Sequence, residues 1–479
     1  MYWLGSAPEA PALADRPVAA DRSAGAVRTL IVAAAGTMLV LAVFSAFVVT
    51  IGSSGRSLGA GITGETWALS GMSLGLATAL LTAGALADEV GHGKVLVWSA
   101  GLLALAGVVG ALAPSIAVLI GSRVLQGIAG GAVLASALGS IGRTFRAEAA
   151  RTRATSIWGA AVGAGITAGP LAAAGLQSAL GWRSGFWAEA AAAAGLMIAA
   201  RGVNDHAPPA ARHRHGARPR RRSDIAGMAT LAGAMAVLTS CLVEARRGWS
   251  RPATLLLLAV AAALLAAFTV VELTRHRPML DPRLLRQPPF LASIVGALFL
   301  GLAVVGLMSF SPTFFQRGLG VSVLDSAALL SAWSATSTVV ALAARSLPAQ
   351  IATRARLVIG LLLAAGGELA LTGLGHANGW PRLLPGLIVA GVGTGIANAA
   401  LGRIAIESVP AAQAGMGSGA NNTARYLGGA AGVALVVSVA SAAGVNDPTV
   451  GWNHAALLSG ALCALGAAIV ASCRAWRLL

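Results

Sequence analysis

Two acids lie inside long uncharged stretches of the chain, where an ionised side chain is costly and therefore needs a purpose. By helical rise, Glu189 would lie ~9 Å and Glu368 ~17 Å from the start of its own segment. Removal from water favours the protonated form of a carboxyl group, so either acid could take up a proton in one environment and release it in another. The alternative for both is a structural hydrogen bond to a neighbouring helix.

A second group of polar residues shares one helix face. Arg123, Gln126 and Gly127 stand at positions i, i+3 and i+4 in the stretch RVLQGIAGG. An arginine near the centre of a bilayer costs ~2.5–3.5 kcal/mol on insertion scales, so we expect Arg123 to face a watery cavity or a partner. The alternative is an arginine that extends its charge to the membrane interface.

A third polar group occurs late in the chain, in the stretch ANNTARYLGGAAGVAL. Asn421, Asn422 and Arg425 lie within two helical turns of one another. They would either contribute to a substrate cavity or join neighbouring helices, and the sequence leaves both possibilities open.

Glycines at four-residue spacing mark the stretch WGAAVGAGITAGPLAAAG. Gly159 pairs with Gly163, and Gly165 pairs with Gly169, which Pro170 follows directly. Glycine at i and i+4 lets two helices approach closely, and proline removes a helix hydrogen bond and bends the axis. The segment is either a hinge or glycine-mediated packing alone.

The stretch GALADEVGHGKVL reads as a short polar hinge between two uncharged stretches. Gly91 allows the backbone to reverse, Asp88 would sit at a helix end, Lys94 supplies a positive charge, and Gly84 precedes them. The alternative is an ordinary polar turn.

These residues require a membrane to position them. The 479 residues are 56% hydrophobic and only 11% charged, whereas about a quarter are charged in typical soluble domains. Stretches without charge, or nearly so, predict fourteen transmembrane helices near 29–52, 66–87, 95–113, 116–141, 155–176, 183–201, 225–243, 253–271, 290–315, 325–346, 357–375, 383–404, 413–441 and 455–473. We therefore expect an all-α integral membrane protein.

The basic residues predict the orientation in the membrane. Most of the 34 lysines and arginines fall in the tails and in every second loop, which predicts cytoplasmic termini. The opposite loops hold seven, namely Arg56, Arg183, Arg246, Arg247, Arg251, Arg317 and Arg382. Because the net charge of +17 is concentrated beside apolar stretches, it does not indicate nucleic-acid binding. The three cysteines fit neither a disulfide framework nor a metal site, and we expect no cofactor.

Weak internal similarity suggests a duplicated unit. A shift of 263 residues pairs Gly165 and Gly169 with Gly428 and Gly432, and other stretches match at nearly the same offset. The predicted domains are a disordered cytoplasmic tail (1–27), a six-helix bundle (28–201), a basic linker (202–224), an inserted helix pair (225–286) and a second six-helix bundle (287–479). The linker is either a topogenic segment or a contact for anionic lipid.

Taken together and in this order, these motifs resemble the major facilitator superfamily. The stretches GWRSGF at Gly181 and ANNTARYLGGAAGVAL resemble those of its fourteen-span drug:proton antiporter branch. G-x-L-x-D-x-x-G-x-x-K is similar to the family's loop between helices 2 and 3, although Glu89, His92 and Gly93 replace its usual basic residues. R-x-x-Q-G is similar to the family's helix 4 motif, in which the arginine is associated with proton coupling. G-x-x-x-G-P is similar to the helix 5 motif of the family's exporters. Ser45 stands where relatives often carry an aspartate, and we count it among the candidate cavity residues.

The resemblance implies two six-helix bundles that rock about a midplane cavity. We therefore expect proton-coupled efflux of small amphipathic or hydrophobic compounds, such as drugs or antibiotics, by a monomer in a bacterial inner membrane. The expected partners are the small-molecule substrate, protons and the lipid bilayer. The alternatives are a transporter for a specific metabolite on the same fold and, more remotely, a membrane enzyme or scaffold. An enzyme is not expected, because no constellation of His, Cys or paired acids recurs at helical spacing inside the spans.

Overall fold

The described part of the chain is helical throughout, apart from turns and short connections. The computed structural model describes residues 24–145, 147–203, 225–245, 248, 250–274, 284, 286–344, 351–374, 380–409, 414–444 and 447–473. Most of the predicted tail 1–27 and of the predicted linker 202–224 lies outside these residues. The tail boundary is wrong by four residues, because the first helix already begins at Ala24. Ala26 is buried there and packs in one apolar cluster with Ile141 and Phe145, which extends the helix beyond the uncharged stretch.

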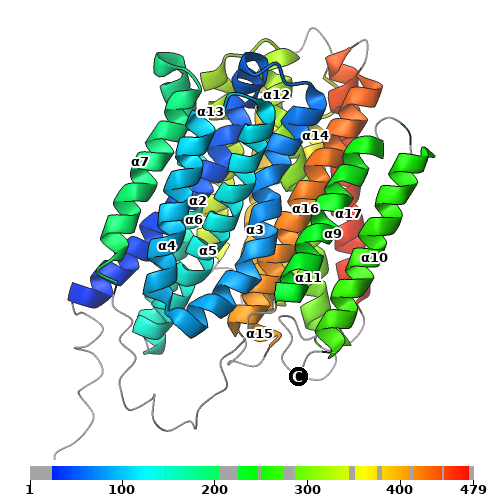
Figure 1. Ribbon diagram of the computed structural model, residues 1–479. Helices are drawn as coiled ribbons and strands as arrows, with labels where there is room; N and C mark the ends of the chain where they lie inside the picture. The colour runs from blue at the N-terminus through cyan, green and yellow to red at the C-terminus, as the bar shows by residue number, and fades with distance from the viewer. Residues whose placement is uncertain are drawn as a thin grey trace, which may run out of the picture.

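The first six long helices follow one another with short connections. They are α2 (Ala24–Ser57), α3 (Ile62–Val90), α4 (His92–Ala111), α5 (Ile116–Thr144), α6 (Glu148–Leu180) and α7 (Arg183–Ala200). They run side by side along one direction of the molecule (Figure 1). We call the end at which α2 begins the terminal end, since α17 finishes there too, and the opposite end the far end.

The next two helices, α9 (Ile225–Glu244) and α10 (Pro252–Thr274), pack against each other at one edge of the molecule (Figure 1). Leu231 of α9 is buried beside Leu74 of α3, and Leu264 and Phe268 of α10 cover the same cluster. The pair is thus attached to the remaining helices through α9, which contacts α3 and α16.

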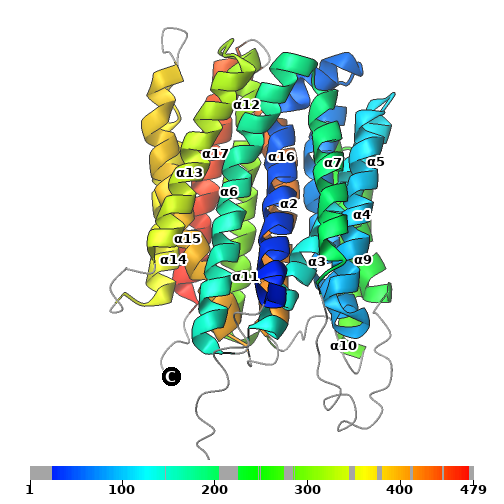
Figure 2. The ribbon, with the colours of Figure 1, turned by 90° about the vertical axis from the view of Figure 1, so that its left-hand side faces the viewer.

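The later helices form the other side of the molecule (Figure 2). They are α11 (Pro288–Leu300), the π-helical turn η3 (Gly301–Val305), α12 (Gly306–Arg317), α13 (Val323–Ala343), α14 (Thr353–Ala370), the 3-10 turn η5 (Trp380–Arg382), α15 (Leu383–Glu407), α16 (Ala414–Ala443) and α17 (Pro448–Ser472). The stretch predicted near 290–315 corresponds to α11, η3 and α12, which follow one another without a break.

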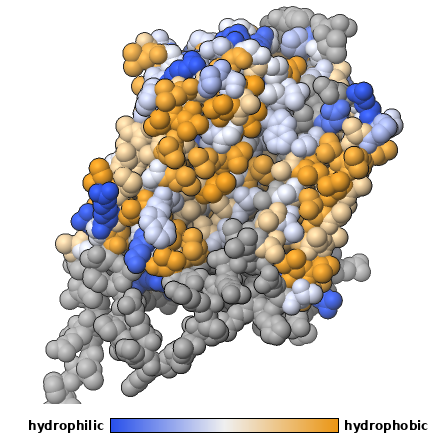
Figure 3. All heavy atoms as spheres, viewed as in Figure 1, coloured by the Kyte–Doolittle hydropathy of each residue, from blue (hydrophilic) through white to orange (hydrophobic). Residues whose placement is uncertain are grey.

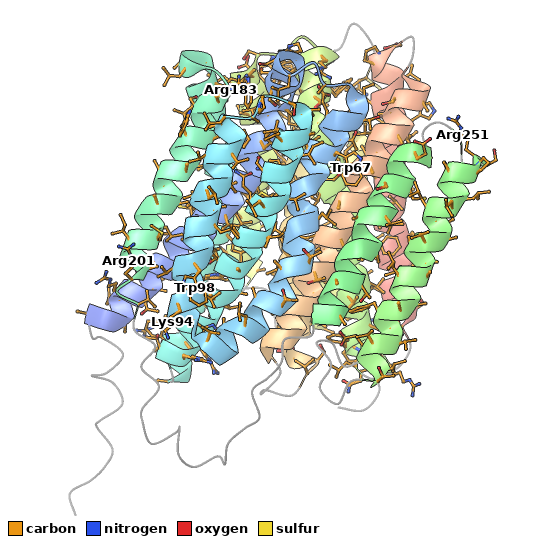
Figure 4. All side chains as sticks on the ribbon, in the orientation of Figure 1. Trp67, Lys94, Trp98, Arg183, Arg201 and Arg251 are labelled. Atoms are coloured by element: carbon orange, nitrogen blue, oxygen red, sulfur yellow. The ribbon has the colours of Figure 1, made fainter. Side chains whose placement is uncertain are left out.

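Ten segments of the described chain are long and apolar enough to cross a membrane. Helix α14 falls outside that set because it carries Arg354, Arg356 and Glu368 within 18 residues. Apolar residues cover the middle of the face in Figure 3, and hydrophilic residues gather mostly towards the two ends. Arg183 and Arg251 lie near the far end, and Lys94 and Arg201 near the terminal end (Figure 4). The chain is therefore a multi-pass membrane protein.

Matching glycine contacts relate the two sides of the molecule. A Cβ atom on Gly165 or Gly169 of α6 would overlap the carbonyl oxygen of Met38 or Ala42, four residues apart on α2. On the other side, a Cβ atom on Gly428 or Gly432 of α16 would overlap the carbonyl oxygens of Leu298 and Leu302, at the junction of α11 and η3. Glycines that the 263-residue shift pairs in sequence thus make equivalent helix contacts.

Candidate functional site

Three hydrogen-bonded polar side chains, Arg123, Gln126 and Glu189, link α5 to α7. Arg123 Nη1 donates a hydrogen bond to Gln126 Oε1 at 2.6 Å, and Gln126 Nε2 donates one to Glu189 Oε2 at 3.1 Å. Arg123 and Gln126 are almost completely buried, and Glu189 is partly buried. The Gln126 amide therefore bridges a buried cation and a partly buried acid.

Helix α2 completes the surroundings of Arg123. The guanidinium lies over the Phe47 ring, 4.4 Å from its centroid, and Nη1 is 3.4 Å from the Val43 carbonyl oxygen. A cation over an aromatic face is stabilised by the ring quadrupole, more strongly where water is absent. The Nε atom of Arg123 is buried without a hydrogen-bond partner. The Arg123 guanidinium thus has both a polar and an aromatic partner among the neighbouring helices.

Close packing of α3 against α5 holds in place the helix that carries Arg123 and Gln126. A Cβ atom on Gly127 would overlap the Met72 carbonyl oxygen, and one on Gly75 would overlap the Val124 carbonyl oxygen. These glycines let the two helix backbones touch, as small residues do in membranes. Gly127 therefore has a packing role, while Arg123 and Gln126 supply the polar groups.

The second acid, Glu368, lies on α14 and is separate from the Arg123–Gln126–Glu189 series. It is completely buried, and neither carboxyl oxygen makes a hydrogen bond of normal geometry. Ser459 and Cys463 on α17 are the polar groups that face it. A buried polar group without hydrogen bonds is costly, so Glu368 needs a structural or functional compensation.

The polar residues of α16 point in different directions. Asn421 Nδ2 donates hydrogen bonds to the Ser293 carbonyl at 3.1 Å and to Ser293 Oγ at 2.8 Å, which joins α16 to α11. Asn422 Nδ2 donates to Ser418 O within its own helix, at 3.0 Å. Arg425 makes no side-chain hydrogen bond with a described residue, and its Nε is buried without a partner.

Ser45 is buried at the contact between α2 and α6. Its hydroxyl donates to the Leu41 carbonyl at 2.9 Å and lies 3.4 Å from the Gly165 carbonyl oxygen. A Cβ atom on Gly169 would lie 2.5 Å from Ser45 Oγ. In this structure the Ser45 side chain therefore takes part in helix packing.

The glycines of α6 differ from one another, although the sequence gives them equal spacing. Gly165 and Gly169 pack against α2, and a Cβ atom on Gly163 would overlap Thr338 of α13, whereas one on Gly159 would meet nothing within 4 Å. The expectation of close helix approach at Gly159 does not hold in this structure, because no atom of a neighbouring element lies within 4 Å of a Cβ placed there. Pro170 lies inside α6, which continues to Leu180.

The predicted polar hinge is shorter than the sequence suggests. Gly84 and Asp88 lie within α3 and Lys94 lies within α4, so Gly91 is the only residue between the two helices. Gly91 has φ of 113°, a conformation that only glycine adopts easily. Lys94 is exposed at the terminal end.

Sequence reasoning missed an ion pair at the far end. Arg317 of α12 donates from Nη2 and Nη1 to the two carboxyl oxygens of Glu65 on α3, at 2.6 and 2.8 Å. Next to it, Gln316 Nε2 donates to the Val49 carbonyl of α2 at 2.9 Å. The only signal in the sequence was that Glu65 and Arg317 both flank apolar segments. Within the described residues, no group of three or more His, Cys, Asp or Glu side chains could hold a metal ion.

The chain resembles known proteins in sequence and in fold. The family model described as Major Facilitator Superfamily matches residues 30–433. The chain is 28% identical over 393 residues to "Multidrug resistance protein Stp" of Mycobacterium tuberculosis, covering 81% of this chain and 71% of that protein. It is 29% identical over 456 residues to "Tetracenomycin C resistance and export protein" of Streptomyces glaucescens, covering 90% and 81%. The crystal structure of the human organic anion transporter MFSD10 (TETRAN) has the same fold, with a TM-score of 0.61 at 18% identity, covering 94% of this chain and 100% of that one.

Proposed function

The chain belongs to the Major Facilitator Superfamily, and we propose that it exports small amphipathic or hydrophobic compounds, drugs or antibiotics among them, from a bacterial cell in exchange for protons. The printed names of its relatives, a multidrug resistance protein and a resistance and export protein for tetracenomycin C, support export as the activity. The observation that carries the coupling is the buried chain from Arg123 through Gln126 to Glu189.

The hydrogen-bonded series Arg123–Gln126–Glu189 can respond to a proton. An ionised Glu189 accepts a charge-assisted hydrogen bond from Gln126, whose amide is polarised by Arg123. A protonated Glu189 is a weaker acceptor, so its link to α5 loosens. Proton binding at Glu189 would thereby change how firmly α7 is attached to α5. Glu368 is the second candidate carrier, because its carboxyl group is buried without hydrogen bonds.

Alternating access requires contacts between the two sides of the molecule that can break. At the far end, Arg317 binds Glu65 and Gln316 binds the Val49 carbonyl, so that α12 is fastened to both α3 and α2. We propose that these contacts hold the far end closed, and that they separate when the transporter opens there. Glycines let α6 pack closely on α2 and α16 pack closely on η3, and these close contacts would let each side move as a unit.

We further propose fourteen spans, made by α2 to α7, α9, α10, the continuous rod from α11 to α12, and α13 to α17. The first six would form one bundle (28–201) and the last six another (287–479), with α9 and α10 as an inserted pair (225–286). In this arrangement the terminal end faces the cytoplasm, and the transporter acts as a monomer in the inner membrane. The excess of basic residues at that end supports the orientation.

Two cysteine reporters test the orientation. Cys473 lies at the terminal end of α17, and Ser57 is exposed at the far end of α2. A membrane-impermeant maleimide applied to intact cells should label Ser57→Cys in a Cys473→Ser background, and should label Cys473 of the parent only after permeabilisation. The reverse result would place the termini outside and overturn the proposal.

Proton flux in liposomes tests the function itself. Purified protein reconstituted with a drug gradient should move protons in the opposite direction, and expression in an efflux-deficient host should lower its susceptibility to several drugs. Antiport would be excluded if none of the compounds that the host assay identifies causes proton flux. A resistance pattern confined to one metabolite would favour the specific transporter.

A further inference from the structure

Arg425 is a partly buried cation that has no counter-charge among the described residues. It lies ~17 Å along α16 from the helix start at Ala414, about three turns inside the helix. Within the described chain no hydrogen bond or ion pair involves its guanidinium, and Nε is buried without a partner. The residue as a whole is still partly exposed. The terminal nitrogens are therefore available to a group that the protein itself does not supply.

The chain has few acids that could neutralise Arg425. Of its 17 acidic residues, only Glu189 lies more than one helical turn inside a described helix, and Glu368 is completely buried near the end of α14. Glu189 is bound by Gln126 of α5, and Glu368 faces Ser459 and Cys463 of α17. An unpaired charge at this depth is costly, and such residues mark substrate and ion pathways in membrane proteins.

The neighbours of Arg425 on α16 show which way it faces. Gly428 and Gly432 pack against the junction of α11 and η3, and Tyr426 packs against Phe44 of α2. With 100° between successive residues, Arg425 lies about 20° from Gly432 and about 100° from Tyr426. A Cβ atom on Gly301 of η3 would overlap the Arg425 carbonyl oxygen, so the Arg425 side chain starts beside the η3 contact on the side that leads to α2. Helix α2 belongs to the first side of the molecule and η3 to the second. Arg425 therefore faces the seam between the two sides, where a transported compound would pass.

We propose that Arg425 binds the acidic group of the transported compound, so that preferred substrates carry a carboxylate or an acidic phenol on an aromatic body. This inference rests on the proposed export function and adds the substrate class to it. The planar guanidinium can donate two parallel hydrogen bonds to such an oxygen group. Beside it, the Phe44 and Tyr426 rings stand edge to face, with centroids 5.9 Å apart, and offer an apolar surface for the body of the compound.

A matched pair of ligands tests the charge directly. Full-length purified protein is dialysed to equilibrium with anthracene-9-carboxylate or with the neutral anthracene-9-carboxamide, which has nearly the same shape. We expect the parent to bind the acid about tenfold more tightly than the amide or better, since a buried partner charge contributes at least that much. Arg425→Gln should abolish this preference and leave binding of the amide unchanged. Arg403→Gln, which removes an exposed arginine paired with Glu407, serves as the control and should keep it.

Several outcomes would overturn the inference. They are equal binding of acid and amide by the parent, binding of neither probe, and an acid preference that survives Arg425→Gln. If that variant does not fold, Arg425→Lys replaces it: the point charge should lower the preference about threefold, and an unchanged preference rejects the role of the guanidinium fork. Export of a cationic dye by the parent is measured in parallel. Dye export without acid preference would leave the proposed function standing and reject only the substrate class.

Discussion

Arg317 and Glu65 join two helices that are 252 residues apart in the chain, through two hydrogen bonds of 2.6 and 2.8 Å. The Glu65 side chain is 8% exposed and that of Arg317 is 37% exposed, so water competes for the pair only from one side. Gly55 of α2 makes room for the carboxylate, because a Cβ atom there would overlap Glu65. The pair is thus closely packed between α3, α12 and α2 at the far end.

Glu65→Gln should favour opening at the far end. The neutral amide loses one charge-assisted interaction, and hydrogen bonds to charged groups contribute ~1.5–3 kcal/mol. A reporter cysteine at Gly52, which lies near Gln316 between α2 and α12, should react with an external maleimide at least several-fold faster in this background. The matched control is Arg403→Gln at the exposed pair Arg403–Glu407, where a surface ion pair contributes little. Equal labelling rates in both backgrounds would mean that the pair does not hold the far end closed.

Glu189→Gln should abolish proton-coupled export and leave folded protein in the membrane. The amide has nearly the shape of the carboxyl group and can still bond with Gln126, but it cannot carry a proton. Drug-driven proton flux in liposomes is the readout, with size-exclusion chromatography as the folding check. Glu407→Gln, at an exposed acid on α15, is the control and should retain flux. Normal flux in the Glu189 variant would move the coupling group elsewhere.

Glu368→Met should raise thermal stability, because it replaces a buried carboxyl group that makes no hydrogen bond of normal geometry by an apolar side chain of similar size. A gain of ~1–3 kcal/mol corresponds to the desolvation cost of such a group. The melting temperature of the purified protein measures this effect, and proton flux shows whether the acid is also a carrier. A stabilised variant with full flux would identify Glu368 as structural, whereas a less stable variant would show that the carboxyl group supports the packing of α14 on α17.

The glycines of α6 should respond differently to leucine. Gly165→Leu forces a side chain into the Met38 carbonyl and should stop transport, whereas Gly159→Leu enters open space and should transport at the parental rate. Gly428→Leu should behave like Gly165→Leu, because it meets the Leu298 carbonyl in the equivalent contact. Drug accumulation in an efflux-deficient host compares the variants at equal membrane expression. If Gly159→Leu fails as completely as Gly165→Leu, the contacts with α2 do not explain the motif.

The sequence by itself determined the helices and their order. Apolar stretches of this length must become helices in lipid, because no water is present to bind free backbone groups. Contacts within one helix could also be predicted from the sequence. The three-residue spacing predicted that Arg123 and Gln126 share a helix face, and their side chains form a hydrogen bond. The boundaries were less certain, since helices such as α2 continue beyond the uncharged stretch.

Only the tertiary structure decided which distant side chains meet. Glu189 reaches Gln126 across 63 residues, and Glu65 reaches Arg317 across 252, because helices far apart in the chain pack side by side. Gly159 and Gly165 have the same chemistry and the same motif, yet only Gly165 has a helix against it. Spacing fixes the face of a helix on which a residue lies, while packing of the whole bundle fixes what that face touches.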